Sequence, residues 1–350
     1  MNKKHDLSPE QIEAAVQAGI ISKAQAQAMR GNSHLKNVED AALIGNEDDM
    51  RFVRSFSDVF ISIGIGLLVI GLFGFCGMMG GGIAYLLGAA SLWVMAEYFG
   101  KKKRAHLPTL LIALAFLVFV LNGFKDVLNS TGRIDVFPAF VTLGAMLLFY
   151  WRFKLPFSVA LIALSLLILA FSFIGGVVPL GIFLLVSGLA LFAVALYYDA
   201  RDTDRLTRFA DNAFWLHFTA APLILHGIMM LFVKSQAADL TSLVAFVQSG
   251  NTNSVIMLAI VGVLSVVGLA INRRALIVSS LGYAGFAIFM LLKGDGFSMA
   301  NIGSILFLTL LFLGGSIVFL GVGWHATRRA LLAVLPSSGM FGKIFPPVRE

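Results

Sequence analysis

From Val59 onward the sequence consists of long apolar runs separated by short polar breaks, and this feature restricts the fold more than any other. A hydrocarbon core about 30 Å thick is crossed by about 20 helical residues. An unpaired backbone amide in lipid is very costly, and these runs do not alternate as barrel strands do, so each run is expected to be helical. Ten runs fit: 59–77, 80–96, 107–124, 136–151, 156–174, 177–198, 213–233, 254–271, 275–292 and 303–323. The predicted fold class is all-α: an integral membrane bundle of about ten transmembrane helices.

Composition supports this prediction, because 58% of the residues are hydrophobic and only 13% are charged. Soluble domains keep roughly a quarter of their residues charged. The single cysteine, Cys76, cannot pair within the chain, which excludes a disulfide scaffold and a cysteine-rich metal site.

Lys and Arg are distributed unevenly between the two sides of such a bundle. With a cytoplasmic amino terminus, the inner connections hold eleven of them: Lys101, Lys102, Lys103, Arg104, Arg152, Lys154, Arg201, Arg205, Arg208, Arg273 and Arg274. The outer connections hold four: Lys125, Arg133, Lys234 and Lys293. The positive-inside rule therefore predicts that both termini are cytoplasmic. The same bias, with attraction to membrane lipids, accounts for the net charge of +7 without a nucleic-acid partner.

Residues 1–55 are polar and predict a small cytosolic helical hairpin followed by a juxtamembrane helix. Ser8, Pro9 and Gln11 are typical of a capped helix start, and Gly19 and Ser22 of a stop and a second start. This segment contains seven Lys or Arg and eight Asp or Glu, so no basic face for DNA is expected. Docking of a protein partner is one interpretation, and a simple cytosolic appendage is the other. The predicted domains are residues 1–55, a transmembrane domain over 56–324 and a cytosolic tail over 325–350.

None of the formal charges falls inside the predicted spans; Asp58 and Glu97 lie at boundaries, and the segment from Asp199 to Asp211 is expected to be a solvated helical face. Ionisable groups within the bilayer usually mark ion or proton sites. Their absence therefore argues against a pump or a proton-coupled carrier of charged solutes. No Walker loop, HExxH, CxxC or GxSxG motif occurs, so no catalytic residue, cofactor or metal site is predicted, and the protein is not expected to be an enzyme.

The candidate binding residues are His226, Pro222, Met229 and Met230, all in the seventh run. Pro222 frees a backbone carbonyl one turn before His226, and the two methionines follow three and four residues later on the same side. Such a group could form a soft-metal site or a pore constriction. The alternative is a core histidine satisfied by a neighbouring helix, with methionines as gap fillers. His217, nine residues earlier, lies about 180° around the helix and cannot share one ligand with His226.

Small residues suggest how some spans pack and divide. Ser62 and Gly66, and Gly80, Ala84 and Gly88, are spaced four apart, which favours a tight hairpin of the first two spans. Ten spans also permit a division into five plus five near Gly176, as in transporters with inverted repeats, although the halves share no residue-level similarity.

The segment LSPEQIEAAVQAGIISKAQAQAM (residues 7–29), then NEDDMRFVRSF and a train of apolar helices, resembles a group of uncharacterised bacterial multi-pass membrane proteins. That group carries a cytosolic helical hairpin ahead of its spans and is assigned only to a domain of unknown function. The resemblance implies a bacterial inner membrane and supplies no activity or site residue. Two functions stay open: a permease-like protein for a neutral or lipidic molecule, and a structural or regulatory subunit that recruits a partner through its hairpin.

Overall fold

The computed structural model describes residues 18, 56–129, 135–175, 177–202, 207–232, 251–293, 302–335 and 345. Within these ranges the regular structure is entirely helical, and ten helices are long and apolar enough to cross a membrane. The predicted ten-span all-α fold is therefore confirmed, and the chain is a polytopic membrane protein. The predicted amino-terminal hairpin lies outside the described residues.

The helices agree with the apolar runs to within a few residues at most ends. They are α4 (Phe56–Met78), α5 (Ile83–Ala96), η1 (Glu97–Lys102), α6 (His106–Val127), α7 (Val136–Phe153), α8 (Phe157–Ile174), α9 (Leu180–Arg201), α10 (Arg208–Phe232), α12 (Asn251–Ala270), α13 (Arg274–Lys293) and α14 (Ile302–Leu332). Prolines stand at or just before several helix starts, where no amide hydrogen bond is lost: Pro108 in α6, Pro156 before α8 and Pro179 before α9. The largest difference is at α14, which continues as helix well beyond the predicted span end at residue 323.

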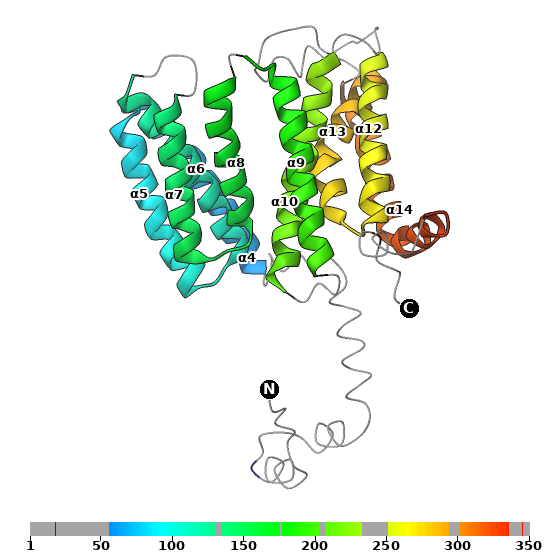
Figure 1. The fold of residues 1–350 in the computed structure, drawn as a ribbon, viewed down its shortest axis with the longest axis horizontal. Coiled ribbons are helices and arrows are strands. Elements are labelled where there is room, and N and C mark those ends of the chain that lie inside the picture. The colour runs from blue at the N-terminus through cyan, green and yellow to red at the C-terminus, as the bar shows by residue number, and fades with distance from the viewer. Residues whose placement is uncertain are drawn as a thin grey trace. The chain divides into compact units, whose positions relative to one another are not determined.

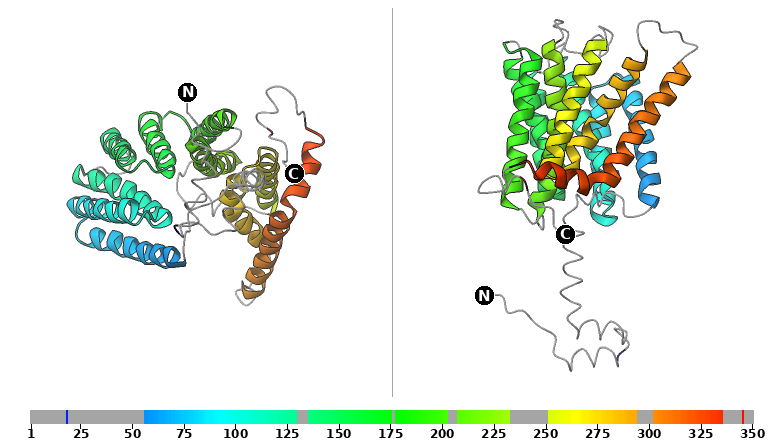
Figure 2. Two further views of the ribbon diagram at one scale, coloured as in Figure 1. Left: turned by 90° about the horizontal axis from the view of Figure 1, so that it is seen from below. Right: turned by 90° about the vertical axis from the view of Figure 1, so that its right-hand side faces the viewer.

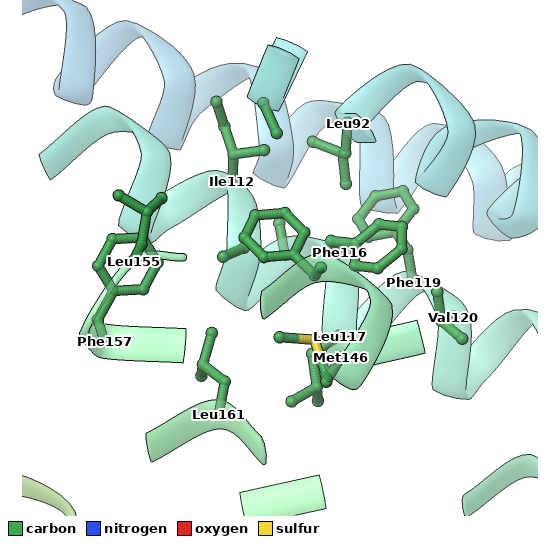
Figure 3. Close-up of a cluster of buried hydrophobic side chains, with 14 of the residues drawn as sticks. Leu92, Ile112, Phe116, Leu117, Phe119, Val120, Met146, Leu155, Phe157 and Leu161 are labelled. Atoms are coloured by element: carbon green, nitrogen blue, oxygen red, sulfur yellow. The ribbon is translucent and has the colours of Figure 1, made fainter. Parts of the chain in front are cut away.

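The first five spans, α4 to α8, form one group around a shared apolar core (Figure 1). α6 is the central helix of this group, since it packs against α4, α5, α7 and α8. Figure 3 shows the core, in which Phe116 and Phe119 of α6 lie among side chains of α5, α7 and α8. Trp93 adds an edge-on contact with Phe149 at a centroid distance of 5.9 Å.

The last five spans, α9, α10, α12, α13 and α14, form the second group. Here α9 packs most closely on α10, and α13 contacts α10, α12 and α14. α8 packs against α9 and α10, and Phe214 and Trp215 of α10 belong to the first core, so these contacts join the groups. The two groups thus share a core and are not separate units, and the described helices of the second group do not repeat the neighbour order of the first.

Lys and Arg gather at the end of the bundle where α5, α7, α9, α12 and α14 finish, which we call the basic end (Figure 1). Its described members are Lys101, Lys102, Lys103, Arg104, Arg152, Lys154, Arg201, Arg208, Arg273, Arg274, Arg328 and Arg329. At the opposite end the described ranges contain Lys125 and Lys293. Figure 2 shows that the last part of α14, in red, turns across the basic end.

A glycine turn joins α4 to α5. Gly80, Gly81 and Gly82 all have positive φ, which residues with a Cβ rarely adopt. The Gly82 amide donates to Asp126 Oδ2 of α6 at 3.2 Å. Gly88 lies against Phe119 of α6, whereas a methyl group at Gly66 would meet nothing within 4 Å. The small residues of α5 therefore bring this helix close to α6. The tight contact of the first two spans that the spacing of Ser62 and Gly66 favoured is not made at Gly66.

Gly81→Ala is expected to destabilise the first group by about 1–3 kcal/mol. Alanine is strained at φ +66°, and its methyl group would overlap the Asp126 carboxylate. The thermal unfolding midpoint in mild detergent measures the effect. Gly74→Ala is the matched control, because a methyl group there meets nothing within 4 Å. Equal midpoints for the two variants would contradict this account of the turn.

Candidate functional site

Helix α10 carries both membrane histidines and presents them to different neighbours. His217 faces α9, where its Nε2 lies 2.8 Å from Asp199 Oδ2. His226 faces α13, where its Nδ1 lies 3.1 Å from the Tyr283 hydroxyl. The predicted separation of the two imidazoles is thus confirmed. Nine residues on a helix correspond to about 13 Å along the axis, so α10 holds polar groups at two levels.

The first level, which is the one farther from the basic end, is the His226 site. We define this site as His226, Tyr283, Met229, Met257 and Met290. Met229 of α10 and Met257 of α12 are buried together with Ala287 of α13. Tyr283 and Met290 pack against this cluster. On α13, residues 283, 287 and 290 lie on one face, and on α10 His226 and Met229 share a face. Two hydrogen-bonding rings therefore lie beside a thioether-lined apolar cluster, and both rings are only partly buried.

The structure brings together some of the predicted binding residues and separates others. His226 and Met229 point toward the same neighbours, α12 and α13. Met230 lies against α9, because a methyl group on Gly181 would be 2.9 Å from its Cβ. Pro222 lies inside α10, which stays helical on both sides of it. Sequence reasoning missed Tyr283, Met257 and Met290, since nothing local indicates which face of another helix will meet His226.

The His226 site is better suited to a neutral molecule than to an ion. Imidazole and phenol groups can donate and accept hydrogen bonds, and methionine side chains adapt to irregular shapes. Ser254, one turn from Met257 on α12, is 1% exposed, and its hydroxyl has no hydrogen-bond partner among the described residues. A buried hydroxyl without a partner is uncommon and fits a place where a further polar group binds. In the described ranges no three His, Cys, Asp or Glu are grouped as metal ligands.

The second level is a buried charged triad of Asp199, His217 and Arg273. Asp199 lies in the last turn of α9, and Arg273 lies in the turn between α12 and α13. The Arg273 guanidinium forms a salt bridge with Asp199 Oδ1, and its Nε donates to the same carboxylate at 3.1 and 3.2 Å. The side chains of His217, Arg273 and Asp199 are 0%, 2% and 12% exposed. The expectation that Asp199 belongs to a solvated face is therefore wrong.

Local backbone geometry explains why Arg273 points into the bundle. α12 ends with Asn272 in the left-handed conformation at φ 56°, which asparagine adopts more readily than most residues. The amide of Arg273 then donates to the Gly268 carbonyl at 2.7 Å, a hydrogen-bond pattern that closes a helix and reverses the chain. The reversal directs the Arg273 side chain back toward α9 instead of outward to water.

The same turn holds the last part of α14. The Trp324 indole donates to Asn272 Oδ1 at 3.1 Å, and the Arg274 guanidinium lies 5.0 Å from the centre of the Trp324 ring. Arg328, 3% exposed, donates from Nε to the Leu269 carbonyl at 3.0 Å. The α12–α13 turn is thus connected to α9 through the triad and to α14 through these contacts.

A charged group at the predicted boundary of a span could have indicated the triad. Asp199 ends one apolar run, and Arg273 separates two others. The sequence alone does not show that these two side chains are buried, because a charge at the end of a span can equally well contact water or a lipid headgroup. Only the arrangement of α9, α10 and the α12–α13 turn shows that these groups meet.

Comparison of the chain with known protein families, with curated proteins and with solved structures finds no match.

Proposed function

We propose that this protein is a permease-like protein of the bacterial inner membrane that binds and moves a neutral or lipidic molecule without converting it chemically. The His226 site is the observation on which the proposal rests. It is built from α10, α12 and α13, lies in the apolar part of these helices, and combines two partly buried hydrogen-bonding rings with thioethers. Polar groups inside a membrane bundle commonly mark the path or the site of a substrate.

The proline in α10 supports this assignment. Substrate sites of transporters commonly lie near the bilayer midplane beside helices whose regular hydrogen bonding is interrupted. Pro222 lies one turn from His226 and interrupts the hydrogen bond that its amide would otherwise donate. The site therefore lies beside a backbone position that can bend, as a carrier requires.

The orientation proposed for this permease follows from the basic end. A cytoplasmic basic end agrees with the positive-inside rule and places both termini in the cytoplasm. The Asp199–His217–Arg273 triad then lies on the cytoplasmic side of the His226 site, about 13 Å along α10. A ligand at His226 would pass the triad on its way to or from the cytoplasm.

Native mass spectrometry of the protein, released from its own membrane in mild detergent, tests the proposal. The expected result is one small molecule or one selected lipid per chain, with occupancy reduced at least about tenfold in His226→Ala. A tenfold loss corresponds to about 1.4 kcal/mol, the range of a hydrogen bond lost on binding. His325→Ala, the same replacement on α14 at the basic end, is the matched control and is expected to keep full occupancy.

Two outcomes would overturn the proposal. Equal occupancy in wild type and His226→Ala would return His226 to core packing. A stoichiometric protein partner with no small ligand would instead favour the structural or regulatory subunit, and would direct attention to residues 8–29.

A further inference from the structure

A buried hydroxyl lies one helical turn beyond Met257, on the side of the His226 site that is away from the basic end. Ser254 belongs to the first turn of α12 and is 1% exposed. Because α12 finishes at the basic end, Ser254 is farther from that end than Met257 is (Figure 1). Three residues of helix place the two side chains on one face, about 4.5 Å apart along the axis.

That face of α12 is turned toward α10 and α13. Leu258, four residues after Ser254, packs against the buried cluster that contains Met229 of α10 and Ala287 of α13. On α13, Met290 follows Ala287 by three residues in the direction away from the basic end, so it reaches about the level of Ser254. Ser254 therefore lies at the far edge of the thioether cluster.

The Ser254 hydroxyl does not make the bond that a serine in a helix usually makes. Such a hydroxyl commonly donates to a carbonyl three or four residues before it, as Ser265 of the same helix donates to the Val261 carbonyl at 2.8 Å. The Ser254 hydroxyl has no hydrogen-bond partner in the part of the chain that the structure describes. An unpaired buried hydroxyl is unfavourable, so a bound molecule that supplies the partner gains from the contact.

Hydrogen-bonding groups thus stand at both ends of an apolar stretch. Met229 lies one turn from His226 on α10, Met257 lies one turn from Ser254 on α12, and the two methionines are buried in the same cluster. The two turns together separate the imidazole and the hydroxyl by about 9 Å along the bundle. The side chains between them are largely thioethers, which have several rotatable bonds and can rearrange around a bound chain.

We propose that Ser254 completes the His226 site, and that this site takes a neutral molecule with a hydroxyl or carbonyl group at each end of an apolar body. One end pairs with His226 and Tyr283, and the other accepts a hydrogen bond from Ser254. An ionic group beside Ser254 would find no counter-ion on α12, whose sequence contains no ionisable side chain. This inference deepens the proposed function and rests on it, because it names the substrate class of the same site.

The experiment compares 1,8-octanediol, which has a hydroxyl group at each end, with 1-octanol, which has one. Both probes are added at the same concentration to the full chain in mild detergent. Native mass spectrometry then gives the ratio of diol-bound to octanol-bound protein. The second hydroxyl makes the diol less apolar, so nonspecific partition favours octanol, whereas a hydrogen bond at Ser254 favours the diol.

Ser254→Ala is expected to lower this ratio at least about tenfold, the scale of a hydrogen bond lost on binding. Ser265→Ala is the matched control, because it removes a hydroxyl of α12 that already has a partner in the helix, and it is expected to keep the wild-type ratio. The ratio compares two probes on one protein, so a variant that binds both less well does not change it for that reason alone.

Thermal unfolding separates a binding role of Ser254 from a structural one. The measurement uses protein whose mass shows no bound molecule. Deleting an unpaired buried hydroxyl removes a desolvation cost, so the midpoint of Ser254→Ala is expected to equal or exceed that of Ser265→Ala. A lower midpoint would show that Ser254 is bonded within the protein and would contradict the proposal.

An equal ratio in wild type and Ser254→Ala would also overturn the proposal, as would a wild-type protein that binds no diol. These failures are distinguishable from failure of the proposed function. A copurified molecule that is lost in His226→Ala and fully retained in Ser254→Ala would refute only the role of Ser254. A ratio that depends on Ser254, in a protein that copurifies with a protein partner and no small molecule, would refute only the permease.

Discussion

Replacement of Gly227 by alanine is expected to lower the stability of the second helix group by about 3 kcal/mol, at the upper end of the range for overpacked cores. α9 and α10 approach each other closely at three glycines. A methyl group on Gly227 would overlap the backbone amide of Leu185 and lie 2.7 Å from its Cα. One on Gly188 would lie 2.8 Å from the Ile224 amide nitrogen. Because the overlap involves backbone, no side-chain rotation relieves it, and the helices must separate.

Size-exclusion profiles and thermal midpoints in mild detergent measure this effect. Gly282→Ala in α13 is the matched control, because a methyl group there meets nothing within 4 Å. Alanine in place of glycine favours a helix by itself, so the control is expected to be neutral or slightly stabilising. A Gly227→Ala protein as stable as the control would show that α9 and α10 are not packed backbone to backbone.

Arg273→Met is expected to cost about 3–5 kcal/mol, because it leaves the Asp199 carboxylate buried without its guanidinium. The double variant Asp199→Asn, Arg273→Met is expected to recover most of that loss, since it removes both charges and keeps an amide beside His217. The thermal midpoints of the two single variants and the double variant complete the cycle.

Arg152→Met provides the comparison for a pair at the surface. Arg152 Nε lies 2.8 Å from Glu97 Oε1, but the two side chains are 38% and 33% exposed. Exposed ion pairs contribute at most about 1 kcal/mol, so this variant is expected to change the midpoint little. Similar losses for Arg273→Met and Arg152→Met would show that the triad is open to water.

α13 and the turn before it make contacts at both levels of α10. His226 of α10 contacts Tyr283 of α13. His217 of α10 contacts Asp199, which in turn binds Arg273 in the turn before α13. A shift of α13 relative to α10 would change both sets of contacts together. A ligand at His226 that shifts α13 relative to α10 is therefore expected to change the contacts of the triad as well.

The fold class and most limits of the spans, other than the end of α14, followed from the amino-acid sequence, because lipid forces every long apolar run to satisfy its backbone hydrogen bonds internally. That requirement is local, so it holds whatever the neighbours of a helix are. The opposite directions of His217 and His226 were predictable for the same reason, since helix periodicity alone sets the angle between them.

The sequence did not show which helices would be neighbours, because neighbours depend on how helix surfaces fit together across the bundle. The spacing of Gly80, Ala84 and Gly88 indicated a close contact but not that α6 supplies it. Met229 and Met230 are adjacent in sequence, yet one packs with α12 and α13 and the other against α9.

The sequence by itself determined a ten-span helical membrane protein whose basic residues gather at one end, because hydropathy and charge act residue by residue. Only the tertiary structure decided that Asp199, His217 and Arg273, from three separate elements, share one buried site. A charge at the end of an apolar run has the same local cost whether it meets a headgroup or a counter-ion. In this protein the α12–α13 turn and the close packing of α9 on α10 bring the charges together, so each meets a counter-ion.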